Sequence, residues 1–560
     1  INIKRNQIYN EVMQNIDNLN INQDRILSLN VPTGTGKTLM SLSAGLKLRD
    51  ILGQQHKLIY ALPFTSIIDQ NYSVFLNVFK KNGIKVDSSL MIKHHYLTPK
   101  KYIKNGSDEG EKYDISKYLI ESWNSEIIIT TFVQLLHSIF SNQNRSLIKF
   151  NNIANSIILL DEVQTIPHKY WKLIKIMLRK IAELLDCYFI FITATMPLIY
   201  SEEKSEIKEL ASSKKEYFNY VDRYKLDLSI VEDDKTVEEF KNFIKEELKT
   251  YKNDNILIVL NTIKTSIKIY NYIQKLIKLG EITGVAMYLS TNIIPKERGK
   301  RINNIGKGGK RQIIISTQMV EAGVDIDLDR VYRDFAPLDS INQSCGRCNR
   351  NFNNSDKGKV ILFKLINEDH NDKAYASYVY SDILLNSTKK IIEECDNFIE
   401  EKKLFEINKK YFKQLNSVKS DDISLQLLDK IEKLKYEKAF WQDERNNGEI
   451  FELIKNNFAT VNLFIELDED AKEIWNQYKK INEIEINNLE DYNRRKEKFE
   501  NIKKDFLSYV ITVPESVAKE QLKDDQLNNT FNHIDIWQVD SLYDIKTGFK
   551  RINDDTHTFF

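Results

Sequence analysis

The sequence is poor in the residues and segments that characterise secreted and membrane proteins. It has four cysteines in 560 residues, too few for a disulfide framework, which fits a reducing, cytoplasmic compartment. It has no apolar run long enough to span a bilayer and no secretory signal, so we expect no membrane contact. The chain begins at Ile1 rather than Met, which favours the interpretation that it is the remainder of a longer protein.

Neither sign of charge predominates in the chain. The sequence has 81 Lys and Arg against 80 Asp and Glu, so its bulk charge does not indicate a polyanionic partner. Any phosphate-binding surface must therefore be local. The length is too great for one hydrophobic core and suggests three or four domains.

Two series of short apolar runs, separated by helix-like segments, predict two α/β domains. Each run is nearly continuous in apolar, often β-branched residues, as in parallel strands that are buried on both faces. Such an alternation is typical of doubly wound parallel sheets. The predicted strands are Ile26–Val31, Lys57–Leu62, Glu126–Thr130, Ile157–Asp161 and Tyr188–Thr193, and then Asn255–Leu260, Val285–Leu289, Gln312–Ser316, Arg330–Phe335 and Lys359–Lys364.

The composition changes along the chain and predicts four regions. A polar stretch at 201–216 marks the end of the first α/β domain, which we place at residues 1–215, and the second follows at 216–366. Long charged helical segments indicate a helical linker or accessory region at 367–505. Short runs at 508–513 (SYVITV) and 535–539 (DIWQV) predict extended segments in a small C-terminal accessory domain, 506–560.

A phosphate-binding loop follows the first predicted strand. The segment Val31–Thr38 reads VPTGTGKT and precedes a helical run, which is the strand–loop–helix context of a P-loop. Its glycines let backbone N–H groups close around phosphates, and its lysine supplies a charge to the β- and γ-phosphates. We therefore expect ATP and Mg²⁺ as cofactors, with Thr38 completing the Mg²⁺ shell. The expected nucleotide contacts here are Thr33, Gly34, Thr35, Gly36, Lys37 and Thr38.

Two acids end the fourth predicted strand. Asp161 is placed to hold Mg²⁺ through water, and Glu162 to orient and deprotonate the attacking water. An Asp-Glu pair is by itself a weak signal, but one domain length after a P-loop it predicts a nucleotide hydrolase. The segment Thr193–Thr195 (TAT) ends the next strand and matches the motif that links the nucleotide site to the nucleic-acid face in helicases.

The second α/β region contains an arginine motif. Residues Gln343–Arg350 fit Q-x-x-G-R-x-x-R, and we expect Gln343, Arg347 and Arg350 to complete the ATP site. Two arginines three apart would lie on one face of a short helix, where both could stabilise a transferring phosphoryl group. A solvated basic helix is the alternative. The preceding segment 315–327 matches a motif that senses nucleotide, with Gly323 and Asp325 as candidate contacts.

Two features near these motifs carry weaker signals. Cys345 and Cys348 form C-x-x-C, but no second pair and no nearby His supports zinc, so we interpret them as filler positions. Gln7, upstream of the P-loop, is a candidate adenine-binding residue, with an ordinary surface glutamine as the alternative.

The order of these motifs predicts a superfamily 2 helicase with two tandem RecA-like domains and an ATP site that needs both. Loop residues at strand ends could then grip the phosphates of a strand without reading its bases. The candidate strand contacts are Pro63, Phe64, Thr65, Ser66, Thr130, Thr131, Asn261, Thr262 and Thr317.

Four longer stretches narrow the family. ALPFTSIIDQ (61–70), TTFVQLLHSIF (130–140), TQMVEAGVDID (317–327) and DFAPLDSINQSCGRCNR (334–350) closely resemble the helicase part of the CRISPR-associated helicase–nuclease of type I interference systems. The resemblance covers residues 1–365 well and is weaker over the tail, where YVITVP and YDIKTG are similar to the family's accessory domain. It implies a cytoplasmic prokaryotic translocase that moves 3′-to-5′ on single-stranded DNA. The RNA-guided surveillance complex would recruit it to the displaced strand of an R-loop.

The chain departs from that family at its beginning. Family members usually carry an N-terminal metal-dependent nuclease domain with a His-Asp dyad, whereas the eight histidines here include no His-Asp dipeptide. The resemblance therefore implies a nuclease that acts in trans or lies on a missing N-terminal segment, and we expect no nuclease activity from this chain. The alternatives are another superfamily 2 DNA or RNA helicase and, from a different class, an inactive nucleotide-binding scaffold.

Overall fold

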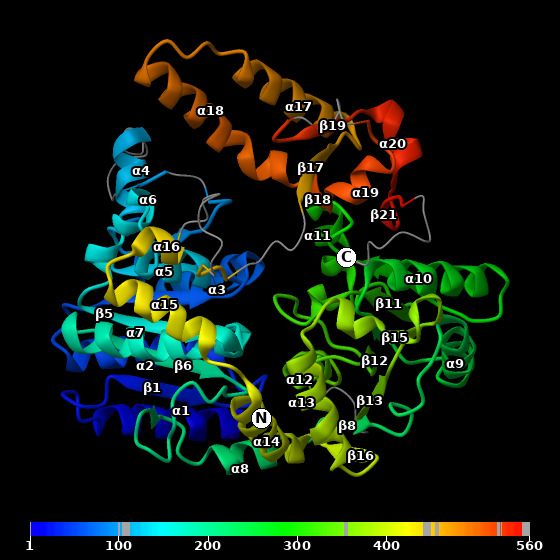
Figure 1. The fold of residues 1–560 in the computed structure, drawn as a ribbon, viewed down its shortest axis with the longest axis horizontal. Coiled ribbons are helices and arrows are strands. Elements are labelled where there is room, and N and C mark those ends of the chain that lie inside the picture. Colours follow the sequence, from blue (N-terminus) through cyan, green and yellow to red (C-terminus); the bar gives the residue numbers. More distant parts are fainter. Residues whose placement is uncertain are drawn as a thin grey trace. The chain divides into compact units, whose positions relative to one another are not determined.

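The computed structural model describes residues 2–98, 101–103, 113–351, 357–440, 450–453, 459–523, 527 and 529–551. The chain divides into two units: residues 1–221 with 405–455, and residues 222–404 with 456–560. Each contains one seven-stranded sheet, so the predicted fold class of two α/β domains with parallel sheets is confirmed (Figure 1). No helix among the described residues combines the length and apolarity needed to cross a membrane.

The first unit has a fully parallel sheet with the strand order β3-β4-β2-β5-β6-β1-β7. Buried Ile, Leu and Phe side chains fill its central strands, as expected where helices cover both faces. The strands are β1 (Ile26–Asn30), β2 (Lys57–Leu62), β3 (Met91–His94), β4 (Ile127–Thr131), β5 (Ser156–Asp161), β6 (Tyr188–Thr193) and β7 (Lys208–Glu209).

Helices from two distant parts of the chain belong to the first unit. From the N-terminal part come α1 (Asn2–Asp17), α2 (Lys37–Ile51), α3 (Thr65–Lys81), α4 (Tyr113–Glu121), α5 (Phe132–Ile139), α6 (Asn144–Leu147), α7 (Trp171–Leu184) and α8 (Lys214–Tyr220). From the later part come α14 (Leu404–Val418), α15 (Asp422–Glu432) and α16 (Tyr436–Phe440). Of these later helices, α15 packs on α7, and the Ser424 hydroxyl donates to the carbonyl of Lys169, just before α7 (2.6 Å).

The second unit repeats this architecture. Its sheet has the order β10-β11-β9-β12-β13-β8-β16, and only β16 is antiparallel. The strands are β8 (Tyr224–Asp227), β9 (Ile256–Val259), β10 (Val285–Leu289), β11 (Gln312–Ser316), β12 (Arg330–Asp334), β13 (Gly358–Phe363) and β16 (Phe398–Glu400), with a small hairpin β14 (Ile366–Asn367) and β15 (Lys373–Ala374). The helices are α9 (Val237–Thr250), α10 (Ile263–Lys278), α11 (Pro295–Asn304), α12 (Leu338–Cys345) and α13 (Asp382–Glu393).

The C-terminal residues of the second unit form a small α/β module. A three-stranded sheet of the order β18-β17-β19 is covered by a helical hairpin, α17 with α18, which Figure 1 shows side by side. The elements are β17 (Thr460–Ile465), α17 (Glu469–Asn482), α18 (Leu489–Leu507), β18 (Val510–Pro514), α19 (Glu515–Lys519), β19 (Asn532–Ile534), α20 (Ile536–Leu542), β20 (Tyr543–Asp544) and β21 (Gly548–Phe549). Aromatic residues such as Phe464 and Phe506 fill the core between the sheet and the hairpin.

The accessory regions differ from the sequence-based division. The boundary at 505/506 falls inside α18, whose module pairs β17 with β18, and residues 367–505 are shared between both units. The prediction of an extended run at 535–539 is wrong, because these residues begin α20. Asp535 and Gln538 form a capping box there, a D-x-x-Q signature of a helix start. The polar stretch at 201–216 does not lie outside the first sheet either, since β7 pairs with β1.

Glu209 in β7 is buried beside the start of the nucleotide-binding segment. Its carboxylate accepts hydrogen bonds from the backbone N–H groups of Asn30 (3.1 Å) and Ala211 (3.0 Å) and from the Ser28 hydroxyl (3.0 Å). Burial raises the pKa of Glu209 to about 7, and the nearby Lys214 ammonium opposes that increase. Because the folded-state pKa exceeds the unfolded one, the free energy of unfolding decreases as the pH rises from about 4.5 to about 7.

We predict that Glu209→Gln removes this pH-dependent penalty. The amide keeps an acceptor for the two backbone N–H groups and carries no charge. The free energy of unfolding of the variant, relative to the wild type, should therefore increase by on the order of 1–3 kcal/mol between pH 5 and pH 8. Urea unfolding followed by circular dichroism at several pH values measures the difference. The exposed Glu203→Gln is the matched control, and a pH-independent difference for Glu209→Gln would contradict the assignment.

Candidate active site

The P-loop lies between β1 and α2. Gly34 (φ 83°) and Gly36 (φ 87°) adopt the left-handed backbone conformation that glycine accepts without strain. The Thr35 hydroxyl donates to the carbonyl of Pro32 (2.7 Å) and fixes the turn. Helix α2 begins at Lys37 with no side-chain cap at Gly36, so its first N–H groups are available to an anion. The loop therefore has the geometry of a phosphate cradle, as the sequence predicts.

Lys37 and Glu162 form an ion pair across the site. Lys37 Nζ lies 3.1 Å from Glu162 Oε1, and both side chains are largely buried. Glu162 follows β5 and is held in the left-handed region (φ 57°), a conformation that costs energy for a residue other than glycine and is frequent at functional sites. The loop lysine and the predicted catalytic base are thus brought together by two distant segments of one unit.

Asp161, at the end of β5, is held by two hydrogen bonds. Its carboxylate accepts from the Tyr60 hydroxyl (2.6 Å) and from the Glu162 N–H (3.0 Å). Burial, and then the charge of Glu162, raises the pKa of Asp161 to about 6, while Lys37 opposes this shift. A divalent cation nearby would favour the ionised carboxylate, so the donor set fits the predicted Mg²⁺ shell. Tyr60 is a site residue that sequence reasoning missed, because a Tyr within an apolar strand gives no signal.

A chain of hydrogen bonds leads from Glu162 to the TAT motif. The Gln164 amide donates to the other Glu162 carboxylate oxygen (2.6 Å) and accepts from the Thr193 hydroxyl (2.5 Å). The Thr193 hydroxyl in turn accepts from the Thr195 N–H (2.9 Å). All four residues lie within the first unit. The last residue of D-E-V-Q, which the sequence analysis gave no role, therefore connects the acid pair to the end of β6.

Helix α1 contributes an arginine to the P-loop. Arg5 donates from Nε (3.1 Å) and a terminal nitrogen (2.6 Å) to the carbonyl of Gly34. Gln7, the candidate adenine-binding residue, lies on the exposed side of the same helix. Arg5 was also missed, since one basic residue on a helix is normally a solvated surface group.

The arginines of the second unit do not lie on a helix, which differs from the prediction. Helix α12 ends at Cys345, and the chain then forms a bridge in which the N–H of Leu328 donates to the carbonyl of Arg347 (3.0 Å). This pairing draws the segment out of helical geometry. Gln343 remains on α12 and is half-buried.

The two arginines occupy different environments. Arg347 is buried, and its guanidinium donates to the carbonyls of Val320 (2.9 Å) and Glu321. Arg350 is more accessible and pairs with Asp325 (Nε to Oδ1, 3.0 Å), which follows Gly323 (φ 77°). The two guanidinium groups therefore have different partners in this structure, and the expectation that both stabilise one phosphoryl group stays a prediction. Arg347 holds the turn after β11, and Arg350 extends beside the candidate contact Asp325.

The cysteines of the C-x-x-C pair are interior residues. Cys345 and Cys348 are fully buried, and burial raises the pKa of each thiol. The Cys348 thiol donates to the carbonyl of Asp329 (3.4 Å). Within the described ranges no group of three or more His, Cys, Asp or Glu is arranged to hold a metal ion. Both cysteines therefore pack in the interior of the second unit.

Most of the candidate strand contacts are buried rather than presented on a surface. The Thr131 side chain caps α5 and that of Thr262 caps α10, while the Thr130 hydroxyl donates to the carbonyl of His94 (2.9 Å). Asn261 donates to Asp334 (2.8 Å). Thr317 is also buried, whereas Pro63, Phe64, Thr65 and Ser66 are at least partly exposed. The residues at strand ends that the sequence suggested as nucleic-acid contacts therefore mostly stabilise the loops in which they lie.

We predict that Lys37→Ala weakens nucleotide binding at least tenfold, because it removes the cation that faces the phosphate cradle. Equilibrium binding of a fluorescent ATP analogue measures the change. Lys47→Ala is the matched control: it lies on the same helix and pairs with Asp17 (2.7 Å), away from the loop. Equal affinities for the Lys37→Ala and Lys47→Ala variants would contradict the placement of the site.

Two family models match the chain. The DEAD/DEAH box helicase model matches residues 7–203, and the model described as the C-terminal part of the CRISPR-associated nuclease/helicase Cas3 matches residues 252–353. These ranges contain the P-loop with the acid pair and the arginine motif, respectively.

Known proteins are similar over most of the chain. The CRISPR-associated nuclease/helicase Cas3 of Haloferax volcanii is 26% identical over 61% of this chain and 47% of its own length. The chain thus spans about half the length of that curated relative. The crystal structure of T. fusca Cas3 with ATP has a TM-score of 0.65 at 14% identity and covers 94% of this chain and 67% of the other. A chain in the structure of a CRISPR RNA-guided surveillance complex before nicking has a TM-score of 0.54 at 14% identity. The match covers 92% of this chain and 65% of the other. By its matches to both family models and to these relatives, this chain contains Cas3-like helicase domains, and its fold is similar to that of the solved Cas3 structures.

Proposed function

We propose that this chain is an ATP-driven motor that translocates 3′-to-5′ on single-stranded DNA and unwinds target DNA in type I CRISPR interference. The observation that carries the proposal is the continuous connection from Lys37 through Glu162 and Gln164 to Thr193. This network supports the proposal, because it connects the residues that we expect to hydrolyse ATP with the motif that we expect to communicate with the strand. A scaffold that only binds nucleotide would not require this arrangement.

The residues divide the work of ATP hydrolysis. The loop amides and Lys37 bind the β- and γ-phosphates. Thr38 and, through water, Asp161 would hold Mg²⁺, which supplies charge stabilisation to the phosphates. Glu162 orients the attacking water and accepts its proton. When Lys37 pairs with the γ-phosphate, its ion pair with Glu162 breaks. The Glu162 carboxylate is then available to accept a proton from the water. The substrate itself therefore activates the base.

Arg350 is the arginine that we propose supplies charge to the transferring phosphoryl group. Its side chain is partly exposed and its ion pair with Asp325 involves an exposed carboxylate, so exchange for a phosphate oxygen costs little. Arg347 would then act as a positioning residue, since its guanidinium is committed to backbone carbonyls. The requirement for both α/β domains in one ATP site remains a prediction from the sequence.

The substrate and partners are proposed from the relatives. The structural neighbour in the pre-nicking state belongs to an RNA-guided surveillance complex, and we infer recruitment of this chain to the R-loop of such a complex. The partners are thus single-stranded DNA, the surveillance complex, and a nuclease domain supplied in trans or by a further segment. We expect no nuclease activity from residues 1–560, because none of the eight histidines is part of a His-Asp dipeptide.

We predict that Glu162→Gln lowers ATP turnover by about 10²-fold or more while ATP still binds, because the amide cannot accept the proton of the water. Phosphate release measures turnover, and a fluorescent ATP analogue measures binding. The control is Glu183→Gln, an exposed glutamate on α7, which should retain wild-type turnover.

Two outcomes would contradict the proposal. Wild-type turnover by Glu162→Gln would show that the base lies elsewhere. The nucleic-acid assignment is tested by measuring wild-type turnover with single-stranded DNA and with RNA of the same sequence. Stronger stimulation by RNA would favour another superfamily 2 helicase.

A further inference from the structure

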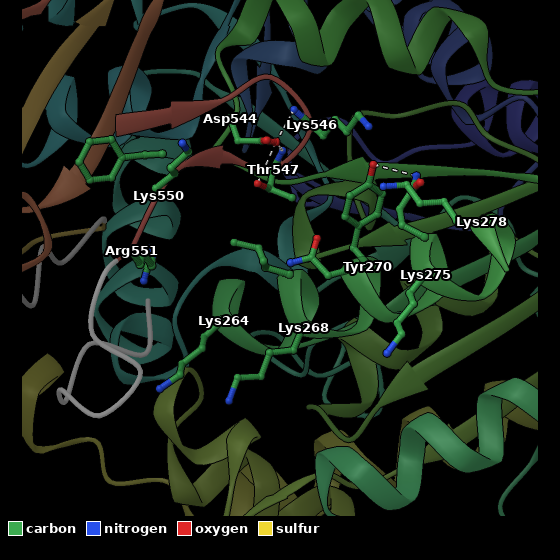
Figure 2. Close-up of a pocket in the computed structure, with 14 residues that line it drawn as sticks. Lys264, Lys268, Tyr270, Lys275, Lys278, Asp544, Lys546, Thr547, Lys550 and Arg551 are labelled. Carbon is green, nitrogen blue, oxygen red and sulfur yellow. Dashed lines mark hydrogen bonds between the residues drawn. The ribbon is translucent and has the colours of Figure 1, made fainter. Parts of the chain in front are cut away.

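A basic groove lies between helix α10 and the C-terminal hairpin β20–β21, within the second unit. Its volume is about 660 Å³. The groove is lined by seven cationic side chains and one carboxylate, in a chain whose formal net charge is only +1. Figure 2 shows the lysines of α10 and those of the hairpin around this space. The cations are Lys264, Lys268, Lys275, Lys278, Lys546, Lys550 and Arg551.

Four of these lysines form a stripe along α10. Lys264, Lys268, Lys275 and Lys278 recur at helical spacing, with Asn271 at the remaining position of the stripe. Figure 2 shows Lys264, Lys268 and Lys275 extending from one side of the helix. The stripe is about 21 Å long at 1.5 Å per residue. Like charges one turn apart slightly destabilise a helix, so the pattern indicates a ligand rather than a contribution to folding.

The opposite wall adds three cationic side chains, Lys546, Lys550 and Arg551, and one carboxylate. Asp544 is the groove's one acid, and its carboxylate accepts from the N–H groups of Lys546 and Thr547 (both 2.8 Å) in the hairpin turn. The Lys550 ammonium donates to the carbonyl of Asp540 (2.7 Å), which holds it at the groove edge without cancelling its charge.

The hairpin is fixed to the loop after β10 and to α11, so the groove is formed before any ligand binds. The Asn292 amide donates to the carbonyls of Thr547 (2.8 Å) and Phe549 (2.9 Å), and Arg301 donates to that of Lys546 (2.8 Å). Gly548 (φ 89°) allows this approach, because a Cβ there would lie 2.0 Å from the carbonyl oxygen of Asn292. A preformed site loses less entropy on binding.

We propose that this groove binds the phosphate backbone of single-stranded DNA, as a site additional to the strand-end loops. The proposal rests on the proposed function. Lysines act as point charges that contact phosphates without reading bases, which suits a motor that must accept any sequence. A protein partner would need an apolar centre with aromatic anchors, whereas Tyr270 and Phe549 are buried beneath the groove. Thr262 caps the same helix, so the groove begins beside the predicted strand contacts.

The test is the salt dependence of DNA binding. A fluorescein-labelled 30-nucleotide single strand is titrated with the 560-residue chain at several salt concentrations, and anisotropy gives the affinity. The groove variant combines Lys275→Ala, Lys278→Ala and Lys546→Ala. Each lost phosphate contact should reduce the slope of log K against log salt by about 0.7, so the slope should fall by about 2.

A charge-matched variant, Lys252→Ala with Lys389→Ala and Lys390→Ala, removes three exposed lysines of the same unit outside the groove. It should retain the wild-type slope. If both triple variants retain that slope, the groove proposal is overturned and the proposed function stands. If the wild-type chain does not bind single-stranded DNA at all, both the groove proposal and the proposed function are overturned.

A second measurement does not depend on variants. Lysine acetylation of the wild-type chain, read by mass spectrometry with and without DNA, should show protection of Lys275, Lys278 and Lys546. Unchanged acetylation of these three lysines on saturation with DNA would overturn the proposal.

Discussion

The ion pair between Lys37 and Glu162 is the interaction on which the rest of the site depends. It joins the P-loop, after β1, to the acid pair, after β5, and both strands must end at the same edge of a parallel sheet for the pair to form. The strained backbone of Glu162 and the burial of Asp161 are tolerated because this cluster is held by Tyr60, Gln164 and the loop itself. In the proposed mechanism, this ion pair also holds Glu162 until a phosphate binds Lys37.

The second unit uses buried polar contacts for a different purpose. Arg333 is fully buried and pairs with Glu321 (2.8 Å), whose carboxylate also accepts from Ser340 and Ser344 on α12. Arg347 binds the carbonyls of the same turn. Removing one member of such a network leaves a buried charge without its partner, which is costly. This network fixes the turn after β11 and the arginine motif relative to each other, and it leaves Arg350 as the more accessible arginine.

The strands that could be predicted from the sequence are those whose side chains are nearly all apolar. The ten strands read as continuous apolar runs all exist, because burial on both faces requires that pattern. Short edge strands such as β3 and β7 escaped prediction because they contain polar residues. The P-loop and acid pair could be assigned from spacing, since the chemistry fixes their residue types. The roles of three other site residues could not be assigned from the sequence, because they arise from tertiary contacts and belong to no motif. These residues are Tyr60, Gln164 and Arg5. The arginine motif was identified from the sequence, but the helix predicted for its two arginines is absent, since the pairing with Leu328 overrides local propensity.

We propose that the hydrogen bonds from Glu162 through Gln164 to Thr193 couple ATP hydrolysis to the DNA strand. The most direct measurement is the ratio of ATP turnover with and without single-stranded DNA in Thr193→Val, a variant of similar shape that lacks the hydroxyl. We expect that ATP still binds to this variant and that stimulation of its turnover by DNA is lost or greatly reduced relative to the wild type. Full stimulation by DNA in Thr193→Val would contradict it.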